Sequence, residues 1–138
     1  MAEKNPIRQI AEVVLRVIDL EKMVAFYQEV LGFEVVHRAP NIVFLKIADL
    51  DSPLGHGGHA QLLGLVDRRT ALDVKRSTLD HLAIEIPLAD FKREKERLEQ
   101  LGLEIRTREY AWSHTRALFF RDPEENQVEF ICHDDGVG

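Results

Sequence analysis

The chain has 138 residues, of which 45% are hydrophobic and 30% charged, a composition typical of an ordinary soluble globular domain. Its net charge of −6 argues against nucleic-acid binding, because neutralising phosphates requires a basic surface. Residues 1–8 lack an apolar signal core, and no apolar run approaches the roughly 20 residues that span a bilayer, so we expect a cytoplasmic protein without membrane association.

The first half of the chain predicts a strand, a helix and three further strands. Residues 12–17 alternate between polar and apolar side chains, so Glu12 and Arg16 share one strand face while the other face is apolar. Asp19 is placed to cap a helix whose apolar residues recur at steps of three and four, and Gly32 is placed to end it. Strands are then expected at 33–37, 42–48 and 59–66, with a loop at 51–58.

The second half predicts the same order of elements. Residues 79–86 form a strand pattern with one polar face, and 88–101 form an amphipathic helix pattern that Gly102 ends. The letters repeat as well, because LGFEV at 31–35 returns as LGLEI at 101–105. Strands are expected at 103–107, 115–121 and 127–132, the last containing the one cysteine, Cys132, as a small buried hydrophobe.

These patterns predict an α+β fold made of two βαβββ repeats, at about 8–66 and 78–133, within one domain covering 1–138 and joined by a linker at 67–77. Each repeat has an apolar strand face, which its helix must cover. The other face carries polar groups, and two such faces curled toward each other would form a mixed sheet around one small-molecule cavity, with the helices outside.

Three stretches carry a resemblance to a known superfamily. They are 14–33, which contains VLRVIDLE, AFY and VLGF, then 79–83 (LDHLA), and 120–130 (FRDPEENQVEF). Together they resemble the vicinal oxygen chelate (glyoxalase/bleomycin resistance protein/dioxygenase) superfamily over about 10–133. The resemblance implies a glyoxalase-like fold, a small-molecule substrate and a homodimer.

One turn departs from the superfamily pattern. Glu125 stands where the superfamily usually has glycine, in the turn before the last strand. Because glycine adopts positive φ at little cost, Glu125 implies a strained turn or a different turn type. Asn126 is the candidate for the left-handed position.

The resemblance also implies metal ligands. Metal-using members take them from the first and last strands of each repeat, and by position these are Glu12, His81 and Glu129. Buried carboxylates and imidazoles are costly unless paired or metal-bound, and a cation would remove the repulsion between the two glutamates. The mixed oxygen and nitrogen donors suit a divalent Mn, Fe, Ni or Zn ion with open water sites.

A fourth ligand position lies on the strand predicted at 59–66. His59, Gln61 and Leu63 face the same way there, because strand side chains alternate. Gln61 is the preferred ligand and His59 the next. If Leu63 is the aligned position, the protein supplies three ligands and water completes the coordination.

Substrate-binding candidates lie near the predicted ligands. Arg16 shares the face of Glu12 and is suited to clamp a carboxylate or phosphate, the alternative being an ion pair with Glu12 or Glu85. A second group lies where a loop enters the strand at 115–121 and comprises Trp112, His114 and Arg116.

Two functions follow from these residues. The first is a metal-dependent enzyme of the lyase, isomerase or epimerase type, in which the ion acts as a Lewis acid and Glu129 or Glu12 is the general base. One histidine with two glutamates departs from the 2-His-1-carboxylate set of non-haem iron oxygenases, which disfavours dioxygenase chemistry unless His59 joins. The alternative is a non-catalytic drug-sequestering protein of the bleomycin-resistance type. Glu12 in place of the superfamily's usual histidine supports it, and the acidic net charge would favour a cationic ligand.

Overall fold

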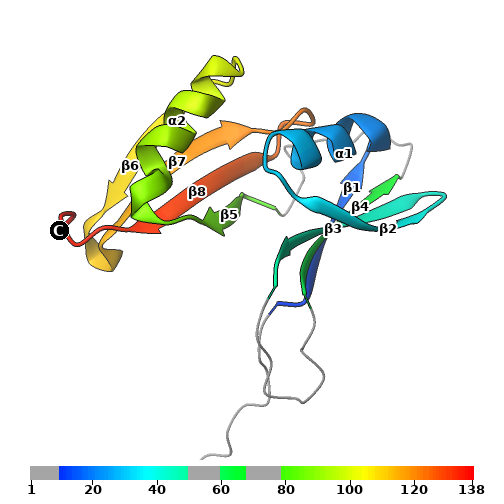
Figure 1. Cartoon of the computed structure of the whole chain (residues 1–138), viewed down its shortest axis with the longest axis horizontal. Coiled ribbons are helices and arrows are strands. Elements are labelled where there is room, and N and C mark those ends of the chain that lie inside the picture. The colour runs from blue at the N-terminus through cyan, green and yellow to red at the C-terminus, as the bar shows by residue number, and fades with distance from the viewer. Residues whose placement is uncertain (1–9, 50–59, 68–78) are drawn as a thin grey trace, which may run out of the picture. The chain divides into compact units, whose positions relative to one another are not determined.

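Two four-stranded sheets, each accompanied by one α-helix, make up the part of this computed structural model that is described, residues 10–49, 60–67 and 79–138 (Figure 1). The chain divides into two compact units, Met1–Thr70 and Ala71–Gly138, and each has the order β-α-β-β-β. The predicted α+β class and its two repeats are therefore confirmed. The loop predicted at 51–58, His59 and nearly all of the predicted linker lie outside the described residues.

The first unit forms a sheet of order β1-β4-β3-β2, in which β1 is parallel to β4 and the other pairs are antiparallel. The Asp19 carboxylate caps the helix by accepting a hydrogen bond from the Lys22 backbone N–H at 3.1 Å. Gly32, at φ +74°, allows the chain to leave the helix in the left-handed conformation. The elements are β1 (Glu12–Val17), α1 (Leu20–Glu29), β2 (Glu34–Ala39), β3 (Ile42–Ala48) and β4 (Gln61–Asp67).

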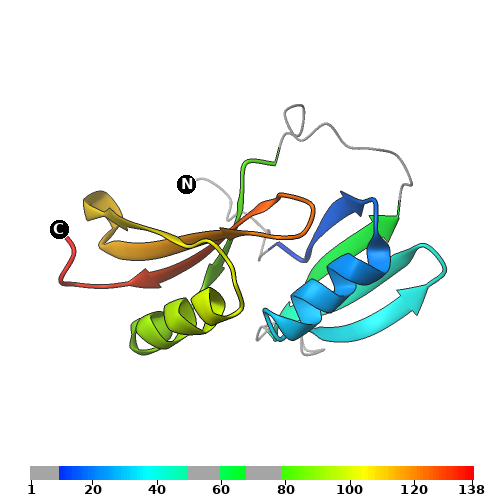
Figure 2. The same ribbon diagram turned by 90° about the horizontal axis from the view of Figure 1, so that it is seen from above.

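The helix α1 covers one face of this sheet by packing on β3 and β4, as both views of this unit show (Figures 1 and 2). Met23, Val24 and Tyr27 are buried on its inner side. In β1, Leu15 is buried while Glu12 and Arg16 are exposed, as the alternation predicts. The face that carries Glu12 is therefore the one opposite α1.

The second unit forms a sheet of order β5-β8-β7-β6 with the same pairing directions. The strand β6 begins three residues later than the predicted 103–107, because Leu103 N–H bonds to the Leu98 carbonyl and completes the helix end. Both α-helices have 10 residues, and no helix in the described ranges is long and apolar enough to cross a membrane. The elements are β5 (Leu82–Glu85), η2 (Leu88–Asp90), α2 (Phe91–Gln100), β6 (Arg106–Tyr110), η3 (Ala111–Ser113), β7 (Thr115–Arg121) and β8 (Gln127–His133).

The strand β8 contains the single cysteine in the position that the sequence indicates. Cys132 is 1% exposed, and this burial is the main cause that raises the pKa of its thiol. A protonated buried thiol behaves as a small hydrophobe, so Cys132 contributes to the packing of the second sheet and not to its chemistry.

The turn between β7 and β8 is built around a buried carboxylate. Asp122 accepts hydrogen bonds from the backbone N–H groups of Glu124 (2.9 Å) and Asn126 (3.0 Å), and from the Asn126 side-chain amide (2.8 Å). Because Asn126 is held by these bonds, Glu125 takes the left-handed conformation at φ +70°. The assignment of the left-handed position to Asn126 was therefore wrong, and the residue that replaces the usual glycine bears the strain itself.

Replacing Glu125 by glycine is expected to raise the free energy of unfolding by about 1 kcal/mol, since a left-handed conformation costs a non-glycine residue ~1–2 kcal/mol. The lost ion pair with Arg121, 4.0 Å long and between exposed side chains, offsets little of this gain. Urea denaturation measures the change. Glu124→Gly is the matched control, because Glu124 is not at positive φ, and it should lower stability. A Glu125→Gly protein no more stable than the parent would contradict the account of this turn.

Candidate functional site

The face of the second sheet opposite α2 carries both ligands predicted in this half. In the parallel β5–β8 pair, Ala83 is in register with Glu129, and His81 lies on the same face because it is two residues before Ala83. His81 Nε2 is 3.1 Å from Glu129 Oε2. The other ring nitrogen, Nδ1, is 2.7 Å from Asp80 Oδ2. The structure therefore brings His81 and Glu129 together and adds Asp80, which the sequence reasoning missed.

This pair lies at the boundary between the packed sheet and solvent. Glu129 is 4% exposed, whereas the His81 side chain is 38% exposed. The ring of Phe119 packs edge-on to His81 at a centroid distance of 6.3 Å and gives the site an apolar side. Two carboxylates flank one imidazole, so the cluster has a net charge of −1 even when the imidazole is protonated. Such a cluster attracts a cation.

Glu129 belongs to a row of residues in register across all four strands of its sheet. On one side of Glu129 is Ala83 of β5; on the other are Phe119 of β7 and then Arg106 of β6. The Arg106 guanidinium lies over the Phe119 ring at 5.7 Å. This row therefore carries an acid, an aromatic ring and a cation on one face.

The first sheet has an equivalent row with different chemistry. It consists of Val14, Gly64, Phe44 and His37, in the strand order β1, β4, β3 and β2. Gly64 holds the place of Glu129, and a Cβ there would lie 2.9 Å from Phe44 Cε1 and 3.0 Å from Val14 Cγ2. The first half therefore has no side chain where the second half has its carboxylate. Glu12, two residues before Val14, corresponds to His81.

The register does not favour the preferred fourth ligand. Glu12 is in register with Leu62 on β4, so Leu62 shares its face. Gln61 is one residue away and lies on the opposite face with Leu63, which is fully buried. Leu62 is apolar and cannot bind a metal ion. Among the described residues of the first unit, Glu12 is therefore the one predicted ligand on this face.

Arg16 lies on the exposed face with Glu12, as predicted. Among the described residues of the first unit, no ion pair involves its guanidinium, so the alternative pairing with Glu12 does not form there. Its role as a clamp for an anionic group stays a prediction.

Arg116, predicted to contact substrate, lies on the face of the sheet opposite to Glu129. It is in register with Cys132, on the face that α2 covers, and stacks at 5.8 Å on Phe91 of α2. Its guanidinium also forms ion pairs with Glu109 and Asp134, both at 3.1 Å. These contacts link β6, α2 and the end of the chain, so the structure gives Arg116 a structural position away from Glu129.

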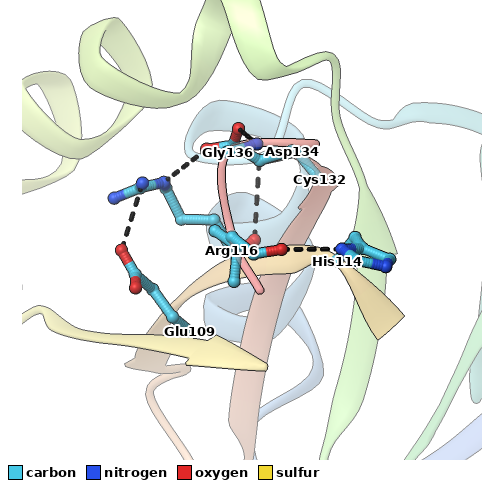
Figure 3. A network of polar contacts seen from close by, with 7 residues as sticks. Glu109, His114, Arg116, Cys132, Asp134 and Gly136 are labelled. Atoms are coloured by element: carbon cyan, nitrogen blue, oxygen red, sulfur yellow. Dashed lines mark hydrogen bonds and ion pairs between the residues drawn. The ribbon is translucent and has the colours of Figure 1, made fainter. Parts of the chain in front are cut away.

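The carboxylate of Asp134 completes this structural network. The Gly136 backbone N–H donates to it at 2.9 Å, and together with Arg116 this hydrogen bond lowers the pKa of the Asp134 carboxyl. Asp134 therefore stays ionised opposite Arg116. The network shown in Figure 3 holds the segment after β8 to Arg116 and His114.

Trp112 and His114 lie on and just after the short η3 turn between β6 and β7. Trp112 is 86% exposed, and His114 adopts φ +51° with its Nδ1 2.7 Å from the Val137 carbonyl oxygen. Within the described part of the second unit, neither side chain contacts His81 or Glu129. Their predicted contact with substrate stays a prediction.

A hollow of about 260 Å³ lies at the C-terminal ends of the parallel strands β5 and β8. It is lined by Glu85, Ile86, Pro87, Leu88 and His133. Glu85 and His133 are on the same face as Glu129, since each is an even number of residues along its strand from the Ala83–Glu129 pair. His133 is four residues along β8 from Glu129, so this hollow is separate from the His81–Glu129 cluster.

The second unit alone supplies two of the three predicted ligands. No cluster of three His, Cys, Asp or Glu side chains suited to a metal occurs among residues 10–49, 60–67 and 79–138. The donors that are present nevertheless fit a divalent ion. The Asp80 carboxylate accepts a hydrogen bond from His81 Nδ1, and His81 Nε2 faces the buried carboxylate of Glu129. A carboxylate behind a ligating histidine is the usual means of fixing its tautomer.

Paired βαβββ units, each with a helix on one sheet face and polar groups on the other, define a class of small-molecule proteins with a duplicated fold. The chain belongs to the Glyoxalase/Bleomycin resistance protein/Dioxygenase superfamily, whose family model matches residues 9–130. The resemblance noted in the sequence is thereby confirmed.

Solved structures support the same fold over nearly the whole chain. A glyoxalase/dioxygenase from Nostoc punctiforme has a TM-score of 0.71 at 17% identity and covers 98% of this chain and 99% of its own. The fosfomycin resistance protein FosX from Listeria monocytogenes has a TM-score of 0.68 at 21% identity, with 94% and 97% covered. A lactoylglutathione lyase from Agrobacterium tumefaciens has a TM-score of 0.65 at 25% identity, with 92% and 95% covered.

Proposed function

We propose that this protein is a metal-dependent enzyme that acts on a small molecule by a lyase, isomerase or epimerase reaction. The observation that supports it most strongly is the buried carboxylate of Glu129, 3.1 Å from Nε2 of a histidine whose Nδ1 is held by Asp80. The proposed ligands are Glu12, His81 and Glu129, with water completing the coordination of Mn, Fe, Ni or Zn. The resemblance implies a homodimer, which we also propose.

The tautomer of His81 follows from its neighbours. A carboxylate only accepts hydrogen bonds, so the contact with Asp80 places a proton on Nδ1. By the same rule Nε2 carries a proton while it faces the Glu129 carboxylate at 3.1 Å, and this proton must leave before Nε2 can bind a metal ion. When bound, the divalent ion supplies Lewis acidity toward substrate oxygen atoms.

Glu129 is the proposed general base. As the base, it would take up at Oε2 a proton from a carbon next to a carbonyl. Returning the proton to the neighbouring atom of the same substrate completes an isomerisation, whereas an epimerisation needs a second group that donates a proton to the opposite face of the same carbon while Glu129 keeps the proton it took. Glu12 is the alternative base, and Arg16, on the same strand face, is proposed to bind an acidic group of the substrate.

The test is the metal content of protein purified without chelator or affinity tag. We expect close to one equivalent of Mn, Fe, Ni or Zn per chain by elemental analysis, and loss of most of it in Glu129→Gln, which keeps the shape of the side chain. Glu96→Gln, at an exposed position of α2, is the matched control and should keep the metal. Metal-free, folded parent protein, or full metal content in Glu129→Gln, would refute the proposal.

One observation favours the second candidate, a sequestering protein without catalysis. His81 and Glu129 already satisfy each other as an ion pair, an arrangement that needs no metal when the imidazole is protonated. The same metal analysis separates the two, since a sequestering protein would be folded and metal-free.

A further inference from the structure

We propose that Arg106 and Gln127 form an anion-binding subsite on the face that carries Glu129, and that the substrate therefore bears a carboxylate, phosphate or phosphonate group. The assignment to the substrate rests on the proposed function. The subsite itself stands on contacts within the second sheet alone.

The side chain of Arg106 crosses the sheet. Arg106 begins on the edge strand β6, passes over the ring of Phe119 on β7 at 5.7 Å, and donates from Nη2 to Gln127 Oε1 on β8 at 2.9 Å. The guanidinium is thus held over Phe119 of β7 and is bonded to a side chain of β8, the strand that carries Glu129. Its position is set by an aromatic face and an amide, both of which are neutral.

The charge of Arg106 is not neutralised within the described part of the chain. Several other arginines there have carboxylate partners, such as Arg38 with Glu21 and Arg93 with Asp90, both at 2.8 Å. Arg106 has only Gln127 and Phe119 as partners among the described residues. A guanidinium oriented by neutral groups keeps donors in a planar fork that matches an oxyanion.

A second arginine strengthens this positive region. Arg108 lies on the same face two residues along β6, with its guanidinium 5.4 Å from the Tyr110 ring, and no described carboxylate pairs with it. The two Cα positions are therefore about 7 Å apart along the strand. The overall charge of −6 favours a cationic ligand, but this face is locally positive on its β6 side.

The subsite is within one small molecule's length of the acid. Arg106 and Glu129 are two strand spacings apart, about 10 Å between Cα atoms, and the arginine side chain extends toward β8. An anionic group bound by Arg106 would hold the remainder of the substrate against Phe119 and Glu129. The acid end and the cationic end of the row thus fit a short substrate with an oxyanion at one end.

The probes are inorganic phosphate, methylphosphonate and acetate at constant ionic strength, added to chelator-treated protein and followed by the NMR signals of the Arg106 Nε–H group and of the Gln127 side-chain amide, which remains in the Arg106 variants. We expect saturable shifts of the Arg106 signal with at least one probe. Binding should weaken about tenfold or more in Arg106→Gln and less in Arg106→Lys, which keeps the charge but loses the fork. Comparison of the three probes separates a carboxylate site from a phosphate or phosphonate site.

Arg93→Gln removes an equal charge from the exposed side of α2 and should leave the affinity unchanged. Three results would each overturn the subsite. They are an affinity of Arg106→Gln equal to that of the parent, a loss of affinity in Arg93→Gln equal to that in Arg106→Gln, and the absence of a saturable shift with every probe. Because the protein is metal-free here, failure of the metal proposal leaves this result unaffected.

Discussion

Replacing His81 by alanine is expected to lower the affinity for Zn²⁺ or Mn²⁺ by on the order of a hundredfold or more, since even residues behind a ligand change metal affinity by 10–100-fold. The free energy of unfolding should fall by about 1–2 kcal/mol, because the substitution leaves the buried Glu129 carboxylate without its partner, and the protein should stay folded. Competition with a chelating dye measures the first quantity and urea denaturation the second. If His81→Ala binds metal as the parent does, His81 is not a ligand.

Asp80 separates a ligand role for His81 from a structural one. Asp80 touches only the far nitrogen of the ring, so Asp80→Ala should weaken metal binding by about 10–100-fold. Asp80→Asn keeps an oxygen acceptor for the Nδ1 proton and should restore most of the affinity. The Asp80 side chain is 91% exposed, so neither variant should change stability measurably.

Replacing Asp122 by alanine is expected to lower the free energy of unfolding by about 3 kcal/mol, the largest loss of stability that we predict for a polar residue here. The buried carboxylate accepts three hydrogen bonds from Glu124 and Asn126, and alanine would leave those donors without their partner. Urea denaturation measures the loss.

Asp122→Asn is the matched variant, because it keeps one acceptor oxygen at the same place and should lose roughly half as much. The turn also holds Glu125 in its left-handed conformation and delivers the chain into β8, which carries Glu129. A change below about 1 kcal/mol in Asp122→Ala would show that this carboxylate does not hold the turn.

Much of the fold was predictable because local patterns determine it. The Asp19 cap, the glycines that follow both helices, and the alternation in β1 each depend on residues a few positions apart. The repeated LGFEV and LGLEI segments then fixed the duplicated architecture.

For the site, the sequence predicts which residues of one strand share a face, but it does not predict which residues of the neighbouring strands lie beside them. Alternation shows that Gln61 and Leu63 share a face, but only the pairing of β1 with β4 shows that Leu62 is the neighbour of Glu12. Arg116 presents the same problem, since both faces of β7 contain polar and apolar residues and only pairing with β8 shows which face α2 covers.

Arg106 was missed for a related reason. Arg106 and Gln127 are 21 residues apart, and only the order β8-β7-β6 brings their side chains together. A signal was present in the sequence RTREY, where two arginines alternate onto one strand face. Asp80, by contrast, is adjacent to His81 in the chain and could have been found from the sequence.

The two repeats have the same architecture and different chemistry. The row that holds Glu129, Phe119 and Arg106 in the second sheet is occupied by Gly64, Phe44 and His37 in the first. Phenylalanine is kept in both, so its packing role is shared. Within this row the acid and the cation occur in the second repeat alone, so Glu129 as the proposed base and the Arg106 subsite both belong to that repeat.

The central claim is that Glu12, His81 and Glu129 bind one divalent ion. The most direct test is anomalous diffraction from crystals grown with Mn²⁺. The account predicts one strong anomalous peak within coordination distance of all three side chains, with Glu12 supplied by the same chain or by a second copy. A peak remote from His81 and Glu129, or three side chains separated on different surfaces in every assembly, would contradict it.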